Sequence, residues 1–151
     1  MKLQRRRFIA ACTAALAAPA CAQVAPPLIE VWKSPTCGCC KDWIKHLEAN
    51  GFTVKTYDSG NTQMRARLGL AEKFGSCHTA RVAGYVVEGH VPAREIQRLL
   101  KERPAALGLA VPAMPVGSPG MDGPEYGGRR DPYDVQLVQQ DGRSTVFQSY
   151  R

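Results

Sequence analysis

The sequence SPTCGCCKDW, residues 34–43, places three cysteines within four positions of the chain. The apolar run before it, residues 28–32, is typical of a short buried strand. After it, apolar side chains recur at helical spacing as far as Asn50 and Gly51, a pair that is typical of a helix end. The thiols are therefore expected at the N-terminus of a helix, where free N–H groups and the helix dipole favour a thiolate.

The first 22 residues have the pattern of an export signal peptide. A basic segment precedes an apolar run at residues 8–18 and small residues up to Ala22, after which cleavage is expected. The pair Arg5-Arg6 resembles a twin-arginine signal, and Sec export is an equally open alternative. Cleavage near Ala22 is favoured over lipoprotein processing at Cys21, because the usual large apolar residue is missing there. The apolar run is too short to span a bilayer, so we expect a periplasmic protein without a stable membrane span.

Removal of this leader changes what charge and cysteine content imply. Four basic residues and no acidic ones lie in the leader, so the formal charge of +7 becomes +3 and a nucleic-acid partner loses its main support. The remaining cysteines are Cys37, Cys39, Cys40 and Cys77. Two disulfides are the default for four cysteines in an exported chain. That default fits badly, because adjacent cysteines such as 39 and 40 cannot form an unstrained bridge.

The order of expected elements indicates an α/β fold. The expected elements are a strand at 52–57, a helix at 61–73, a strand at 81–87 with a short return at 90–91, a helix from Pro92 to before Pro104, a Gly/Pro-rich loop at 105–134, and a hairpin of 135–138 with 145–147. A cysteine-bearing helix directly after the first strand is the order of a thioredoxin-like domain. We expect one domain at 23–151, with a core at 28–122 and an extension at 123–151. It would be a three-layer sandwich with a small mixed sheet flanked by helices, extended by a C-terminal β-hairpin.

Cys37 and Cys40 have the C-x-x-C spacing of thioredoxin-type redox sites, in which one thiol attacks and the other resolves. Cys39 weakens that interpretation, because a third thiol competes as resolver and allows three sulfurs to converge on a metal. Soft thiolates select Cu(I), with Zn(II) as the second choice. Structural disulfide, redox pair and metal site all remain open on this motif alone.

Cys77 and His78 favour the metal site. In a thioredoxin-like fold, the loop before the third strand lies opposite the helix N-terminus that carries the first thiols. Thioredoxins have a cis-proline there, whereas this sequence has no proline between Gly75 and Gly84 and offers a sulfur and an imidazole instead. A lone buried cysteine beside a surface histidine is the alternative.

The other candidate residues are less specific. His90 is equally compatible with a metal ligand and with a position at the opposite end of the domain, away from the thiols. His46 is expected to face solvent. Met114 and Met121 lie in the Gly/Pro-rich loop, where a thioether is either an additional soft ligand or a packing contact of a lid. Trp32 and Trp43 flank the thiols and are expected to exclude water from them.

Four ordered motifs, PTCGCCKDW, SCHTA, GYVVEGHVP and GLAVPAMPVGSPGMD, span about residues 29–122. This combination resembles a family of exported metal-binding proteins first described as a domain of unknown function, which includes the CopG-type copper-resistance proteins with a thioredoxin-like fold. The resemblance implies copper binding by Cys37, Cys39, Cys40 and Cys77, as a small copper–thiolate cluster. His78, His90 and the loop methionines are weaker candidates.

Two classes of function follow from these observations. The first is a periplasmic protein that holds Cu(I), serves copper tolerance and exchanges copper with other periplasmic copper-handling proteins, with redox cycling of copper as an extension. The second is a thiol–disulfide oxidoreductase that uses Cys37 and Cys40. A zinc-stabilised interaction module is a weaker third alternative.

Overall fold

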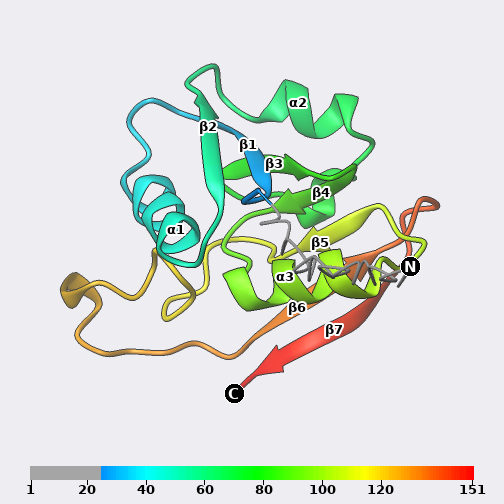
Figure 1. Ribbon diagram of the computed structural model, residues 1–151. Coiled ribbons are helices and arrows are strands. Elements are labelled where there is room, and N and C mark those ends of the chain that lie inside the picture. The colour runs from blue at the N-terminus through cyan, green and yellow to red at the C-terminus, as the bar shows by residue number, and fades with distance from the viewer. Residues whose placement is uncertain (1–24) are drawn as a thin grey trace, which may run out of the picture.

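The computed structural model describes residues 25–151, whose strands form one seven-stranded mixed sheet with helices on its two faces (Figure 1). The expected export signal at residues 1–22 lies outside the described residues. The spatial order of the strands is β2-β1-β3-β4-β5-β6-β7. The strands are β1 Leu28–Lys33, β2 Thr53–Tyr57, β3 His78–Val82, β4 Tyr85–Glu88, β5 Gly108–Ala110, β6 Tyr133–Val138 and β7 Ser144–Tyr150. The β1–β2 and β4–β5 pairs are parallel and the other pairs are antiparallel.

Three α-helices connect these strands: α1 Gly38–Ala49, α2 Thr62–Arg67 and α3 Ala93–Glu102. The helix expected after the cysteine motif is confirmed as α1. The helix expected at 61–73 is wrong beyond Arg67, because Gly69 adopts a φ of +77° that ends the helix. The chain then makes a separate one-turn 3₁₀ helix at Glu72–Phe74.

Two apolar clusters lie on opposite faces of the sheet. The larger cluster includes Trp43 and Leu47 of α1 and Ile96 and Leu99 of α3, so these two helices cover one face together. The smaller cluster joins Leu70 and Phe74 to Val86, Leu107, Ala110 and Val138, and so the segment after α2 covers the other face. Successive side chains of β4 point to opposite faces of the sheet, so Val87 belongs to the first cluster and Val86 to the second.

The single strand expected at 81–87 is wrong: it is a hairpin of β3 and β4. Ala83 and Gly84 both have positive φ, +46° and +90°, as a two-residue type I′ turn requires. An uninterrupted apolar run hid this turn in the sequence. Because β3 starts earlier than expected, His78 is its first residue and pairs with Lys33 of β1. The return strand expected at 90–91 is also wrong, since Val91 donates to the carbonyl of Gly89 in a tight turn before α3.

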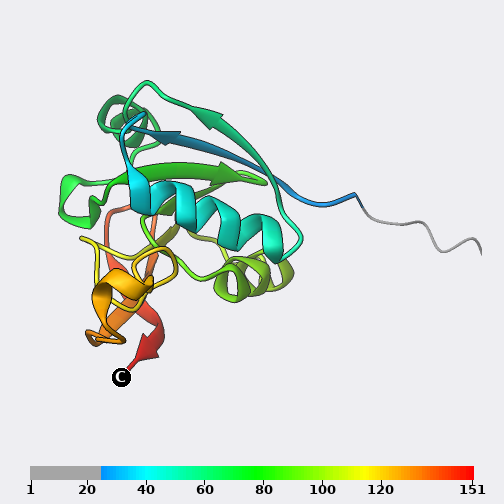
Figure 2. The ribbon, with the colours of Figure 1, turned by 90° about the vertical axis from the view of Figure 1, so that its left-hand side faces the viewer.

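The Gly/Pro-rich region after α3 is not structureless throughout. Its first part contains β5, where Gly108 lies against Val86 so closely that a Cβ would come within 1.8 Å of the Val86 carbonyl oxygen. The later part, residues 112–132, runs past the N-terminal turn of α1 (Figure 2). The hairpin expected over Asp141-Gly142 is confirmed as β6 and β7, and pairing of β6 with β5 makes it part of the main sheet.

Candidate metal centre

The cysteine motif forms the N-terminal turn of α1. Cys37 is the N-cap residue, and its Sγ accepts a hydrogen bond from the backbone N–H of Cys40 at 3.3 Å. Cys37 and Cys40 are joined by a disulfide, whereas Cys39 and Cys77 are free thiols. Strand β1 thus delivers the motif directly to a helix N-terminus, as the sequence predicted.

Cys77 lies opposite this turn, immediately before β3. Its Sγ is 3.5 Å from the Sγ of Cys40 and 3.8 Å from that of Cys39, which in turn is 3.6 Å from the Sγ of Cys37. The four sulfurs all lie within 4.8 Å of one another. Residues separated by about 40 positions in sequence therefore form one sulfur cluster, because β1 and β3 are neighbours in the sheet.

His78 and His90 also face the Cys77 thiol. Nδ1 of His78 is 3.3 Å and Nε2 of His90 is 3.1 Å from Cys77 Sγ. Each ring's second nitrogen faces a backbone carbonyl, that of Gly89 for His78 at 3.0 Å and that of Pro119 for His90 at 2.8 Å. Because a carbonyl can only accept, the proton sits on the nitrogen facing it, and both remaining lone pairs point at Cys77. Histidines that bind metals typically donate their second ring N–H to a backbone carbonyl in this way.

Burial keeps the metal-free site neutral. It lowers the pKa of the fully buried His78 to about 3, an effect that the nearby His90 reinforces. Burial also lowers the pKa of His90, and it raises that of the Cys77 thiol to about 12, with Cys39 adding to the rise. Neutral imidazole is the form that binds metals, whereas the thiol must lose its proton on binding. Metal binding at Cys77 would therefore release a proton.

The tryptophans differ in their relation to the site. Trp43 is fully buried, donates from Nε1 to the carbonyl of Val91 at 2.8 Å, and places its ring 4.2 Å from that of His78. Trp32 instead stacks on Tyr57 of the neighbouring strand β2. Of the two tryptophans, only Trp43 therefore packs directly against an imidazole of the site, as a shield from water.

His46 is not the solvent-facing side chain that the sequence predicted. It is partly buried, and its Nε2 accepts the N–H of Ala93, the first residue of α3. Burial lowers its pKa accordingly. His46 thus caps a helix and takes no part in the sulfur cluster.

The loop at residues 112–122 covers the site from the α1 side. Gly120 lies so close to α1 that a Cβ there would be 2.6 Å from the carbonyl oxygen of Cys39 and 2.7 Å from the N of Trp43. The next residue, Met121, is buried, and its Sδ accepts from the Tyr126 hydroxyl at 3.3 Å. Sequence reasoning missed Tyr126, and it also missed Gly120, although the repeated Gly and Pro around Met121 gave a signal for a close approach.

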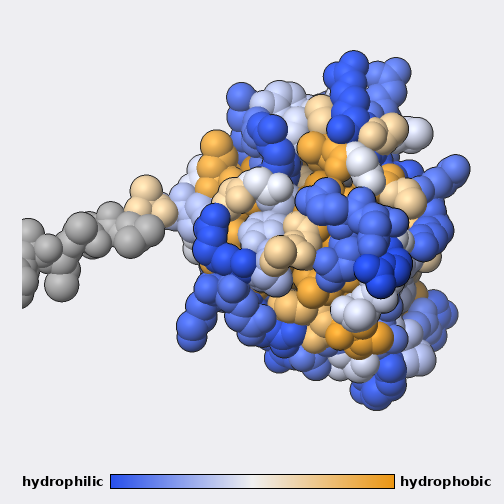
Figure 3. All heavy atoms as spheres, turned by 90° about the vertical axis from the view of Figure 1, so that its right-hand side faces the viewer, coloured by the Kyte–Doolittle hydropathy of each residue, from blue (hydrophilic) through white to orange (hydrophobic). Residues whose placement is uncertain are grey.

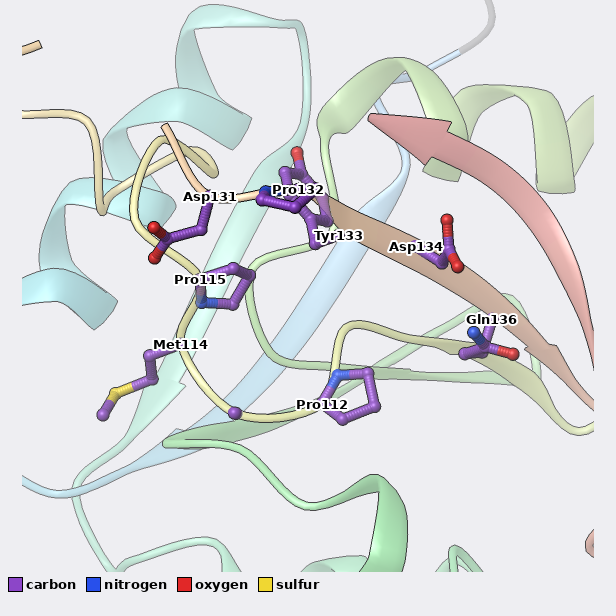
Figure 4. A pocket seen from close by; sticks show the side chains of 9 residues that line it. Pro112, Met114, Pro115, Asp131, Pro132, Tyr133, Asp134 and Gln136 are labelled. Atoms are coloured by element: carbon purple, nitrogen blue, oxygen red, sulfur yellow. The ribbon is translucent and has the colours of Figure 1, made fainter. Parts of the chain in front are cut away.

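Met114 lies elsewhere on this loop. It is 48% exposed and lines a groove with Pro112, Pro115, residues 131–134 and Gln136 (Figure 4). The structure therefore separates the two candidate methionines: Met121 is buried beside a residue that contacts α1, whereas Met114 borders open solvent.

Comparison with known proteins identifies the family of this chain. A family model described as "Protein of unknown function, DUF411" matches residues 74–121. Two solved structures, both described as copper resistance protein copG in forms 2 and 1, are 47% and 48% identical to this chain. Each covers 83% of it, with 99% and 98% of their own lengths aligned and TM-scores of 0.77 and 0.76. The chain belongs to the CopG family of copper-resistance proteins. A search of curated proteins gave no match.

On the face drawn in Figure 3, this CopG-family chain shows hydrophilic residues interleaved with smaller hydrophobic areas. Leu28, Met114 and Val146 are the large apolar side chains that the described part of the chain exposes. Between residues 25 and 151, no helix is both long and apolar enough to cross a membrane.

Proposed function

We propose that this protein is an exported copper-binding protein that serves copper tolerance. The observation that carries the proposal is the convergence of four cysteine sulfurs and two imidazoles, with Cys77 common to both groups. In the reduced protein, Cys37, Cys39, Cys40 and Cys77 would hold Cu(I), and His78 and His90 would complete the donor set. Several sulfurs in contact favour a multinuclear copper–thiolate cluster.

The chemistry of the donors supports copper over other metals. Thiolates are soft ligands and prefer Cu(I), and neutral imidazole suits both oxidation states of copper. Zinc is the alternative, since sulfur and nitrogen donors also suit Zn(II). Of the two loop methionines, the buried Met121 is the better candidate for an additional soft ligand, because Met114 is about half exposed at the groove.

The Cys37–Cys40 disulfide supports a second part of the proposal, the redox cycling of copper. In this step the two thiols form the S–S bond, two protons leave, and two Cu(II) ions become two Cu(I) ions. After oxidation, Cys39, Cys77, His78 and His90 remain as donors. These two thiols and two imidazoles would hold the Cu(I) that the step forms, since both donor types suit Cu(I). A thiol reductant that converts the disulfide back to two thiols would complete the cycle.

A thiol–disulfide oxidoreductase is the second candidate function, and the same disulfide favours it. Cys37 is partly exposed and Cys40 is buried, as an attacking and a resolving thiol would be. This alternative requires only that pair, so replacement of Cys39 by Ala would leave thiol–disulfide turnover largely intact. Copper binding would be damaged by the same replacement.

The wider assignments belong to the same proposal. We infer a thioredoxin-like core, supported by the β2-β1-β3-β4 order with parallel β1–β2 and antiparallel β1–β3–β4 pairing. We also infer a periplasmic location after cleavage near Ala22, with one domain at 23–151. Other periplasmic copper-handling proteins would deliver or receive the copper.

Anaerobic titration of the reduced protein with Cu(I) tests the main proposal. We expect tight binding of at least one Cu(I) per chain, and a large loss of affinity when Cys39 or Cys77 is replaced by Ser. Weak, substoichiometric binding that survives both replacements would exclude the copper site. Preferential retention of Zn(II) over Cu(I) in competition would favour the zinc alternative.

A further inference from the structure

Glu88 is a fully buried carboxylate that lies outside the set of sulfur and nitrogen donors. It ends β4, where it pairs with Thr79 of β3, and its side chain has no exposed surface. Burial raises the pKa of Glu88, while hydrogen bonds from its neighbours oppose that rise. Burial of a carboxylate destabilises the folded state unless its oxygens accept hydrogen bonds. The donors around Glu88 therefore indicate its role.

The partners of Glu88 converge on the residue that precedes Cys77. Its Oε1 accepts from Nε of Arg65 and from the backbone N–H of Ser76, both at 2.8 Å. Its Oε2 accepts from the hydroxyl of Thr79 at 2.6 Å. All three contacts are donations to oxygen, which is the arrangement that suits an ionised carboxylate.

The carbonyl of Ser76 is held as firmly as its N–H group. It accepts from a terminal guanidinium nitrogen of Arg65 at 2.9 Å and from Nδ2 of Asn61 at 3.1 Å. Both peptide groups of Ser76 are therefore fixed by side chains from β4 and the α2 region. The second of these peptide groups joins Ser76 to Cys77, so it sets the direction in which Cys77 leaves the loop.

We infer that Glu88, together with Arg65, is a positioning residue for Cys77. It holds the shared thiol at the distances from Cys39, Cys40 and the two imidazoles that the cluster needs. Buried ion pairs contribute little net stability compared with apolar packing of the same volume, so a requirement for fixed geometry explains the charges better than stability does. The inference rests on the proposed copper site, and it adds residues that do not bind copper but hold the backbone of a ligand in place.

The test compares Glu88→Ala and Glu88→Gln with the control Glu95→Ala. Glu95 is also buried, at 3% exposure, and is paired with Arg94 and Arg98 of its own helix α3. It thus matches the loss of a buried, ion-paired carboxylate without touching the Cys77 loop. Each reduced protein is titrated anaerobically with Cu(I) against a chromogenic chelator, and the copper–thiolate absorption in the ultraviolet is recorded.

We expect Glu88→Ala to lower Cu(I) affinity by about 10- to 100-fold and to alter the copper–thiolate absorption. Glu88→Gln should regain part of the affinity, because its amide oxygen still accepts from the Ser76 N–H. Glu95→Ala should keep the unsubstituted affinity and absorption. Equal affinity in all variants, or an equal loss in Glu88→Ala and Glu95→Ala, would overturn the positioning role; if Glu88→Ala does not fold, the comparison of Glu88→Gln with Glu95→Gln decides in the same way.

A second measurement separates this inference from the copper proposal. Hydrogen exchange at the backbone amide of Ser76 is measured in the metal-free protein. Faster exchange in Glu88→Ala than in Glu95→Ala supports the positioning role of Glu88, whether or not the protein binds copper. Failure of the unsubstituted protein to take up Cu(I) would refute the proposed function alone. Equal exchange rates at Ser76 would overturn the positioning role.

Discussion

The close approach of the 112–122 loop to α1 makes Gly120→Ala the most informative single substitution in this protein. Gly120 has a φ of +83°, and an added Cβ would lie 2.6 Å from the Cys39 carbonyl oxygen and 2.7 Å from the Trp43 nitrogen. Both neighbours are backbone atoms of α1, which cannot turn aside as a flexible side chain would. The loop itself must therefore shift away from the cysteine turn.

Two costs add in this variant. The left-handed backbone costs an alanine about 1–2 kcal/mol. Forcing a methyl group into a closely packed contact costs about 1–3 kcal/mol more. Gly142→Ala is the matched control, because Gly142 has nearly the same φ of +80° but no atom within 4 Å of an added Cβ. We therefore expect a loss of about 1–2 kcal/mol in the control and about 2–5 kcal/mol in Gly120→Ala.

Denaturant unfolding of both metal-free variants measures the difference, and Cu(I) competition measures its functional effect. Because Pro119 holds His90, a displaced loop should also weaken Cu(I) binding in Gly120→Ala and leave it unchanged in Gly142→Ala. Equal losses of unfolding free energy in the two variants would refute the argument from close packing. A large loss of stability with unchanged copper affinity would show that the loop packs on α1 without shaping the site.

Three further predictions concern the buried histidines, Trp43 and the disulfide. The folded pKa of His78 is about 3 and those of His46 and His90 are also lowered, so the unfolded chain binds more protons below pH 6.5. The metal-free protein should keep its full stability near pH 7.5 and lose about 2 kcal/mol by pH 5 from His78 alone. An unfolding midpoint that stays constant from pH 7.5 to 5 would contradict this. Trp43→Phe leaves the Val91 carbonyl without its donor and should cost about 1–3 kcal/mol in denaturant unfolding, whereas a cost below about 0.5 kcal/mol would mean that the carbonyl finds another partner. Reduction of Cys37–Cys40 should raise the Cu(I) equivalents bound per chain, as measured by anaerobic titration, and equal capacity before and after reduction would remove these two thiols from the site.

Local signals in the chain were enough to predict much of the fold. The period of the apolar residues located β1, α1, β2 and the terminal hairpin, since each has its pattern bounded by turn residues. The turn at Ala83-Gly84 was missed because alanine rarely adopts positive φ and because apolar residues flank it on both sides. Strand β5 was missed because three residues in a Gly/Pro-rich region carry no period, and it exists only through its pairing with β4 and β6.

At the candidate site too, some features follow from the local sequence and others only from the tertiary structure. Spacing alone was sufficient to bring Cys37, Cys39 and Cys40 to one helix turn, because a helix N-terminus is a local structure. The convergence of Cys77, His78 and His90 on that turn depends on β1 pairing with β3 and on the turn after β4, which are contacts between distant segments. The fixed imidazole tautomers, the close approach of Gly120 and the carboxylate behind Ser76 depend on packing among three or more elements, and no pattern in a single stretch of chain encodes them.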